Sequence, residues 1–444
     1  MFKVFKDRFI LAAIALAVIA FCASYVETRR PQLAEAADVP GSAFYGYRGE
    51  APGTTHKITV ADLPAPKPSE SVDNGQDVIP RPSNTWPQVP PGFKVELYAS
   101  DIKSPRLIRT APNGDYFVAD SYANQVLVFR GVDSSGKAQQ SGVFANGLKQ
   151  PFGIAFYPAG PDPQWIYIAD TDAVLRFPYR VGDLKARGEP QKIADLSGGG
   201  RLRGGGHWTR DVAFSKDGKK MFVSVGSRSN ADDTDNNEAE YHRANVLEFN
   251  PDGSGERVYA SGIRNAVGIA VSPQTGELWG SVNERDGLGN NLVPDYITHI
   301  QDNGFYGWPW YYIGKHQDPR LEDKHPDLRA RTIIPDVLIQ PHSASLQMTF
   351  YNGKQFPAEY LGDIFASEHG SWNRNPPVGF VVIRVPLKGT GHSTGEYQDF
   401  MTGFVTKDGK VWGRPVGVAT GNDGSLVVTD DGSGSLWRVT YKGN

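Results

Sequence analysis

One stretch of the chain decides the fold: Gly204-Gly205-Gly206-His207-Trp208-Thr209-Arg210-Asp211, followed by Val212-Ala213-Phe214-Ser215-Lys216-Asp217-Gly218. Its second part is a short apolar run that ends in an Asp-Gly turn, which predicts a β-strand and a turn into the next strand. Its first part is a glycine-rich loop that places a histidine, an arginine and a carboxylate directly before that strand. The stretch therefore joins a piece of β scaffold to residues that could carry chemistry.

The same strand-turn-strand pattern recurs along the chain. Copies begin at Pro105, Pro151, His207, Arg264, Ser345 and Arg414. Each copy reads as strand, turn, strand, loop, strand, and the copies begin roughly every 45 to 80 residues, the spacing of propeller blades with variable insertions. The pattern predicts an all-β fold, a six-bladed β-propeller. A β-sandwich is the alternative, but it does not explain the repetition.

The composition agrees with many short strands and tight turns. The 444 residues include 50 glycines and 32 prolines, and 11% are aromatic. The net charge is −3 with both signs interspersed, which gives no electrostatic basis for binding nucleic acid. The sequence contains no G-x-S-x-G elbow, no P-loop and no dinucleotide fingerprint in a βαβ context. A redox enzyme of this sequence would therefore need a cofactor other than nicotinamide on a Rossmann fold.

The chain before residue 92 divides into two segments of different composition. Lys3, Lys6 and Arg8 precede an apolar run from Phe9 to Val26, so residues 1–31 are predicted to be a signal peptide or a membrane anchor. Residues 32–91 are rich in Pro, Ala and Gly and predict a linker or a strap lying on the domain surface. Residues 92–444 are expected to form the propeller domain, in a periplasmic or otherwise extracytoplasmic location.

Two large insertions follow the third and fourth copies, at Ser229–Arg243 and Arg285–Gln340. Insertions of a propeller usually cluster on one face, where a ligand is held. The functional site is therefore expected on that face.

Several residues near the copy starts could form the site. His207 suits a general base near neutral pH, although a loop histidine can equally bond to backbone. Arg264 and Asn265 stand in the equivalent place before the fourth copy and could bind carboxylate or quinone oxygens, or could satisfy turn carbonyls. The oxygen-rich loop at 283–295 could bind Ca²⁺ or be solvated. The aromatic run at 303–312 could stack on a flat ligand or cap a blade.

These motifs resemble those of a known family. Gly206-His207-Trp208-Thr209-Arg210-Asp211, Ser261-Gly262-Ile263-Arg264-Asn265, Asn283-Glu284-Arg285-Asp286 and Asn303-Gly304-Phe305-Tyr306-Gly307-Trp308-Pro309 are similar to segments of the soluble quinoprotein sugar dehydrogenases, sorbosone dehydrogenase branch. Members of that superfamily are six-bladed propellers that use pyrroloquinoline quinone (PQQ) and Ca²⁺. The similarity extends from about residue 91 to the C-terminus.

The resemblance implies a role for each matching residue. His207 would be the general base that takes the sugar hydroxyl proton, and Arg264 and Asn265 would contact the quinone. The backbone of Asp286 and Gly287 would bind Ca²⁺. Arg414 would face the carboxylates of PQQ, and Arg374 is a looser candidate for a basic group from the fifth blade.

The sequence departs from the family pattern in two places. A carboxylate that orients the catalytic histidine in better-known members is missing at Gly226-Ser227-Arg228, so Asp211 or Asp232 is expected to replace it. Arg285 and Asp286 also stand where smaller or neutral residues are usual, so this chain departs from the family pattern at the expected calcium ligands.

The sequence therefore predicts an exported PQQ- and Ca²⁺-dependent dehydrogenase that oxidises a sugar and passes electrons to an external acceptor, a quinone or a cytochrome. Two alternatives remain open. One is a calcium-dependent propeller lactonase in which His207 activates water. The other is a propeller without enzymatic activity that binds a partner at the membrane surface.

Overall fold

A computed structural model describes residues 42–200, 206–389 and 391–443. Within these residues the fold is nearly all β, and the helices are single 3-10 turns. These turns are η1 (Tyr47–Gly49), η2 (Val60–Asp62), η3 (Pro68–Glu70), η4 (Ser121–Ala123), η5 (Glu238–Glu240), η6 (Pro319–Leu321) and η7 (Ala358–Tyr360). In the same ranges, none of the helices has the length and apolar character needed to cross a bilayer. The predicted signal or anchor segment at 1–31 and the residues Gly204 and Gly205 lie outside the described ranges.

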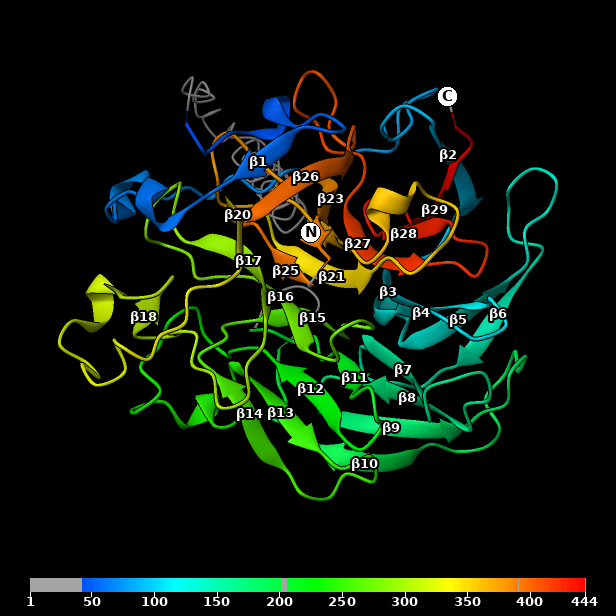
Figure 1. Ribbon diagram of the computed structural model, residues 1–444, viewed down its shortest axis with the longest axis horizontal. Helices are drawn as coiled ribbons and strands as arrows, with labels where there is room; N and C mark the ends of the chain where they lie inside the picture. The colour runs from blue at the N-terminus through cyan, green and yellow to red at the C-terminus, as the bar shows by residue number, and fades with distance from the viewer. Residues whose placement is uncertain (1–41, 201–205, 390, 444) are drawn as a thin grey trace, which may run out of the picture. The chain divides into compact units, whose positions relative to one another are not determined.

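Six antiparallel sheets confirm the predicted six-bladed propeller (Figure 1). The first blade contains β3 (Pro105–Thr110), β4 (Tyr116–Asp120), β5 (Gln125–Arg130) and β6 (Gln140–Ala145). The second contains β7 (Gly153–Tyr157), β8 (Trp165–Ala169), β9 (Ala173–Pro178) and β10 (Gln191–Asp195). The third contains β11 (Val212–Phe214), β12 (Met221–Val225), β13 (Asn245–Phe249) and β14 (Arg257–Ser261).

The fourth blade contains β15 (Ala266–Val271), β16 (Leu278–Val282), β17 (Pro294–His299) and β20 (Val337–Pro341). The fifth contains β21 (Ser345–Phe350), β22 (Ile364–Glu368), β23 (Val381–Val385), β26 (Glu396–Met401) and β1 (Thr55–Lys57). The sixth contains β27 (Pro415–Thr420), β28 (Leu426–Asp430), β29 (Ser435–Tyr441) and β2 (Phe93–Ala99). Two small ribbons pair β18 (Tyr311–Tyr312) with β19 (His316–Gln317) and β24 (Leu387–Lys388) with β25 (His392–Ser393).

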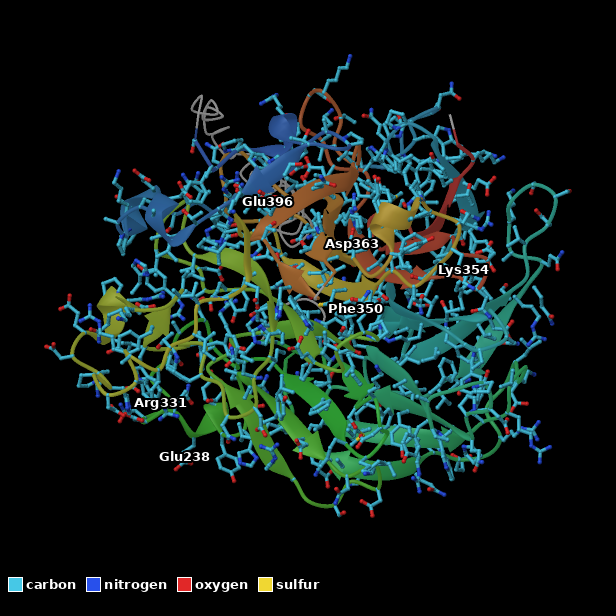
Figure 2. The ribbon with its side chains drawn as sticks, viewed as in Figure 1. Glu238, Arg331, Phe350, Lys354, Asp363 and Glu396 are labelled. Atoms are coloured by element: carbon cyan, nitrogen blue, oxygen red, sulfur yellow. The ribbon has the colours of Figure 1, made fainter. Side chains whose placement is uncertain are left out.

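The first strand of each blade faces the centre. β3, β7, β11, β15, β21 and β27 contact one another in that order, and β27 contacts β3 again, so the ring is closed. Apolar side chains from neighbouring blades fill the space between the sheets, as Phe117, Ile154 and Ile168 do between the first two blades. Charged side chains also occur between the strands: Asp363, labelled in Figure 2, accepts at Oδ2 from Arg384 Nε at 2.6 Å in the fifth blade.

Each blade contains at least one more strand than the three that the repeat predicted, and the fifth blade contains two more. The second strand of the third blade, β12, is buried along its whole length, which produces the continuous apolar run that the sequence shows. The fourth strand, such as β14, is half exposed and carries polar residues, so it gives a weaker signal. The predicted insertion at 285–340 also contains two strands of the fourth blade, β17 and β20.

The chain before the first blade lies against the propeller. We call residues 42–91 the strap. Its strand β1 pairs with β26 and extends the fifth blade to five strands, with Thr55 opposite Gln398. Further along, Val78 bridges to Val411 and Gln88 to Thr402. β2 then pairs with β29, so the sixth blade combines strands from both ends of the described chain.

Candidate active site

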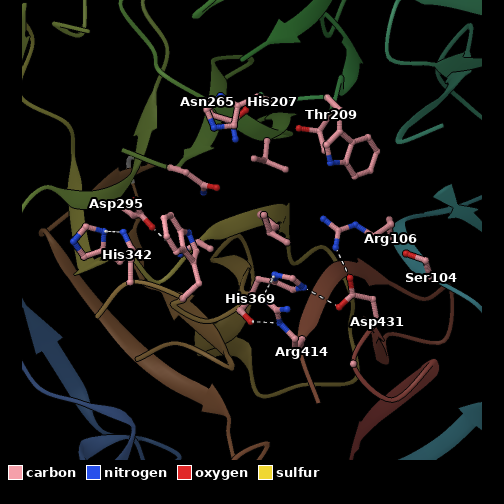
Figure 3. Close-up of a pocket in the computed structure, with 18 of the residues that line it drawn as sticks. Ser104, Arg106, His207, Thr209, Asn265, Asp295, His342, His369, Arg414 and Asp431 are labelled. Atoms are coloured by element: carbon pink, nitrogen blue, oxygen red, sulfur yellow. Dashed lines mark hydrogen bonds and ion pairs between the residues drawn. The ribbon is translucent and has the colours of Figure 1, made fainter. Parts of the chain in front are cut away.

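The site cavity lies at one end of the central channel and has a volume of about 820 Å³ (Figure 3). Its polar residues follow a topological rule. Some precede the first strand of a blade, namely His207, Arg264, Asn265, His342 and Arg414, and others follow the second strand, namely Asn283, Glu284, Asp286, His369 and Asp431. In antiparallel neighbours the start of one strand and the end of the next lie at the same edge. Residues far apart in sequence therefore meet around one cavity.

His207 is held as a neutral ring with one nitrogen fixed. Nδ1 lies 2.9 Å from the carbonyl oxygen of Ser227 and 3.0 Å from its hydroxyl. Because a carbonyl only accepts, Nδ1 carries the proton and Nε2 keeps its lone pair. Burial, reinforced by the positive charge of Arg264, lowers the pKa of His207 to about 3. The histidine thus lines the cavity as an unprotonated base.

The partner that orients His207 is Ser227, not Asp211 or Asp232 as the sequence suggested. The Asp211 carboxylate is buried beneath the third blade, where it accepts from Arg109 at 2.9 and 3.1 Å and from the backbone of Ile269 at 2.9 Å. Asp232 accepts from Asn237 at 2.8 Å on an exposed loop. Ser227 directly follows β12 and Gly226, so the strand end itself delivers the backbone carbonyl that fixes the ring.

Asn265 packs beside His207 on the same wall (Figure 3). Gly226 permits this contact, because a Cβ there would stand 2.2 Å from Asn265 Oδ1 and 2.7 Å from His207 Cβ. Asn265 Oδ1 is buried and has no partner among the described residues. A buried acceptor without a donor is costly, so this oxygen is suited to accept from a ligand.

Arg264 is buried and bound to the insertion loops. Its guanidinium donates to the backbone carbonyl oxygen of Asn230 at 3.1 Å and to the side-chain Oδ1 of the same residue at 2.9 Å. It also donates to Asp286 Oδ2 at 3.1 Å. Burial alone would raise the pKa of Asp286, but Arg264, His342 and Asn373 hold it below its ordinary value. Arg264 and ionised Asp286 therefore form a fixed charge pair at the cavity wall.

The contacts of the predicted calcium ligands do not suit a metal. The carbonyl oxygen of Asp286 accepts from Asn230 Nδ2 at 2.9 Å and from the Arg320 guanidinium at 3.0 Å, and a cationic donor opposes binding of Ca²⁺. Gly287 is not among the residues that line the cavity. Nowhere in the described ranges do three or more His, Cys, Asp or Glu side chains form a group that could hold a metal ion.

Arg414 takes part in a network on the opposite wall. It donates to His369 Nδ1 at 2.9 Å, and His369 Nε2 lies 2.8 Å from Asp431 Oδ1. Arg106 donates to the other oxygen of Asp431 at 2.5 Å (Figure 3). Burial, together with the charge of Arg414, lowers the pKa of His369 to about 4. Two guanidinium groups thus face the cavity from the first and sixth blades, with a neutral histidine and an ionised carboxylate between them.

Arg374 is not at the cavity, contrary to its looser assignment from the sequence. It is fully buried and donates to the backbone of Tyr45 in the strap, to Asn290 O at 3.3 Å and to Asn291 Oδ1 at 3.0 Å. The guanidinium therefore ties the strap to the loop after the fourth blade's second strand. The preceding residue, Asn373, lines the cavity in its place.

The aromatic run at 303–312 is structural. Phe305, Tyr306, Trp308 and Trp310 are buried, and none of them lines the cavity. Two of the indoles bind the other insertion: Trp308 Nε1 donates to Asn230 O at 2.9 Å, and Trp310 Nε1 donates to Asp233 at 3.2 Å. The run therefore fixes the insertion loop that carries Asn230, and through it Arg264.

Five further residues of the site were not among those predicted from the sequence: Arg106, Asp295, His342, His369 and Asp431. All five line the cavity. The signal that could have found His342, His369 and Asp431 is their position, directly before a first strand or after a second strand of a predicted copy.

Comparisons with known proteins agree with this architecture. The model of the family described as TrAA12-like matches residues 87–303 and 313–442. An uncharacterised protein of Borreliella burgdorferi is 30% identical over 368 residues, which cover 80% of this chain and 91% of that protein. A pyrroloquinoline quinone-dependent pyranose dehydrogenase of Coprinopsis cinerea is 24% identical over 409 residues, and the match covers 78% of this chain but only 54% of the relative.

Solved structures show the same fold. The holo form of the PQQ domain of the Coprinopsis cinerea pyranose dehydrogenase superposes with a TM-score of 0.67 at 23% identity, over 81% of this chain and 98% of that domain. A Trichoderma reesei enzyme of carbohydrate-active family AA12, in its calcium structure, gives a TM-score of 0.68 at 17% identity, over 81% of this chain and 98% of the other.

Proposed function

Because this chain belongs to the TrAA12-like family, within the superfamily of soluble quinoprotein sugar dehydrogenases, we propose that it is a PQQ-dependent oxidoreductase that oxidises a sugar. The observation that carries the proposal is His207 in the cavity, with its Nδ1 protonated and fixed by Ser227 and its Nε2 available as a base. On the basis of the sequence resemblance, we further propose that the substrate is similar to sorbosone.

The cavity fits PQQ in size and charge. PQQ is a planar tricarboxylate, and such a group needs several cationic or N–H donors around it. Arg106, Arg414 and Lys103 line the cavity, and Arg106 Nε is a buried donor without a partner among the described residues. We propose that Arg414 and Arg106 bind the carboxylates, and that Arg264 and Asn265 lie on the quinone side, beside His207.

The chemistry then divides between the cofactor and the chain. When bound, PQQ supplies a two-electron acceptor for the hydride of the substrate carbon. His207 Nε2 takes the proton of the hydroxyl on that carbon, and the Ser227 carbonyl, bonded to Nδ1–H, stabilises the imidazolium that forms. Arg264 lies next to His207 and presents positive charge where negative charge develops. The electrons finally leave to an external quinone or cytochrome.

Calcium is implied by the family resemblance but is not part of this proposal. The carbonyl oxygen of Asp286 already accepts two donors, and one of them belongs to Arg320. No step is therefore assigned to the ion.

We propose an extracytoplasmic location on the basis of the apolar segment at 9–26, with the N-terminus as a signal peptide or a membrane anchor.

Reconstitution tests the proposal. The purified protein is titrated with PQQ in a calorimeter, with and without added Ca²⁺, and dye reduction is followed over a panel of sugars. We expect PQQ binding and sugar-dependent dye reduction, and Arg414→Ala should weaken PQQ binding because a carboxylate partner is lost. If PQQ does not bind, the dehydrogenase proposal is wrong, and hydrolysis of lactones becomes the reaction to assay.

A further inference from the structure

The strap forms part of the cavity wall. Val78, in the strap, lines the cavity together with Trp372 and Asn373 of the fifth blade. The match to the family model begins at residue 87, so Val78 lies outside the matched part of the chain. Its conformation is fixed on the sixth-blade side, where Ile79 N donates to the carbonyl oxygen of Val411 at 2.8 Å.

The strap also holds the loop that carries Trp372. Asn74 N donates to the carbonyl oxygen of Trp372 at 2.9 Å, and Asn74 Nδ2 donates to the carbonyl oxygen of Arg374 at 2.7 Å. Gly75 lies against the same tryptophan, since a Cβ there would be 3.5 Å from Trp372 Cβ. The backbone on both sides of Asn373 is therefore bonded to one residue of the strap.

Trp372 and Asn373 offer two different surfaces to a ligand. The Trp372 side chain lines the cavity although half of the residue, 50%, is exposed to solvent. Asn373 is buried, donates from Nδ2 to Asp286 Oδ1 at 2.8 Å, and leaves Oδ1 without a partner among the described residues. A sugar ring matches this pair, because its C–H face stacks on an aromatic ring and its hydroxyls donate to a buried acceptor.

We propose that Trp372, Asn373 and Val78 form the subsite for the ring of the sugar substrate, and that Asn74 is a positioning residue for it. This inference rests on the proposed sugar dehydrogenase function and adds a specificity determinant, two residues of which, Asn74 and Val78, lie outside the segments that match the family model. Trp372 supplies the stacking surface, Asn373 accepts a hydroxyl, and the strap closes the side of the cavity next to them. The substrate class is a sugar that presents a single ring to this wall.

Steady-state kinetics of the PQQ-loaded protein test the subsite. Trp372→Ala should raise KM for the best monosaccharide about tenfold and leave kcat within about threefold, because a stacking contact of roughly 1.4 kcal/mol acts alike on ground and transition states. Trp372→Phe should recover part of the loss. Asn74→Ala should shift KM in the same direction by a smaller factor. Trp86→Ala is the matched control, since Trp86 is 45% exposed, belongs to the strap and does not line the cavity.

The outcomes separate this inference from the proposed function. PQQ affinity is measured for every variant and should equal that of the unchanged protein, and thermal unfolding shows that each variant is folded at the temperature of the assay. If the unchanged protein oxidises sugars but Trp372→Ala behaves like Trp86→Ala, the subsite is wrong and the dehydrogenase function stands. If kcat falls while KM stays constant, Trp372 does not bind the sugar ring. A protein that binds PQQ and oxidises no sugar overturns both proposals.

Discussion

The proposed role of His207 depends on its surroundings, since an isolated imidazole would be half protonated near pH 6.5. Burial and the charge of Arg264 lower its pKa to about 3, so the ring is unprotonated throughout the neutral range. Removing it should leave the cofactor contacts intact, because Arg106 and Arg414 stand on the opposite wall. His207→Ala should therefore bind PQQ normally and lose about 10² to 10⁴ in kcat. His242→Ala is the control, because His242 pairs with Glu256 on the surface, outside the cavity. Unchanged turnover in His207→Ala would make His207 structural.

The same lowered pKa predicts the acid side of the pH profile. A base whose pKa lies near 3 remains unprotonated down to about pH 4, so protonation of His207 should cause no loss of kcat/KM between pH 8 and pH 5. The measurement is kcat/KM across this range at constant ionic strength. An acid limb with an apparent pKa near 6.5 that disappears in His207→Ala would show that the ring titrates like a solvated histidine.

Glu368, at the end of β22, is expected to make the stability of the protein depend on pH. Burial raises its pKa to about 7, whereas the unfolded chain has the ordinary value near 4.3. Between these values the folded protein holds a proton that the unfolded chain has lost, so stability falls as pH rises through this window. Glu368→Gln should reduce that fall and stabilise the protein by roughly 1 to 3 kcal/mol at pH 8. Thermal unfolding at pH 5 and pH 8 measures it, and an equal shift at both values would contradict the assignment.

Among the elements, the end of β12 shows how a strand sets the site geometry. Gly226 follows β12 directly, and a Cβ there would collide with Asn265 and His207. Gly226→Ala should displace both side chains and lower kcat about 10²-fold, because small misplacements of reacting groups are costly. Gly142→Ala in β6 is the matched control, as nothing lies within 4 Å of its added Cβ. Equal activity of the two variants would show that the wall can adjust.

The elements also show what the sequence could and could not predict. The second strands were predictable because they are almost wholly buried and begin with apolar residues, as Leu426, Val427 and Val428 do in β28. Outer strands such as β14 were missed because they are partly exposed and carry polar residues. The strand β1 was missed because Thr55-His56-Lys57 has no apolar pattern, and it forms only by pairing with the free edge of β26. The site was predictable only in part. Four of the predicted residues line the cavity: His207, Arg264, Asn265 and Arg414. Arg374 has the charge that the prediction required, but its guanidinium binds the backbone of the strap.

For the whole molecule, closure of the ring depends on β2, which pairs with β29 along most of its length. A chain that begins at residue 42 keeps both β1 and β2, and we expect it to unfold at the temperature of the full chain. A chain that begins at residue 101 loses β2 and exposes the edge of β29, so it should be strongly destabilised or aggregate. Circular dichroism and light scattering on heating compare the two. Equal unfolding temperatures would show that the sixth blade is stable without its outer strand.

This closure has a consequence for the order of events during biosynthesis. Tyr441 leaves the ribosome long after its partner Phe93, so this pair forms late. Bringing such distant segments together costs about 5 kcal/mol of chain entropy, which only the completed sixth blade offsets. Early blades can form during translation, but the ring remains open until β29 has left the ribosome. The rate-limiting step of folding is therefore expected to be the pairing of β2 with β29.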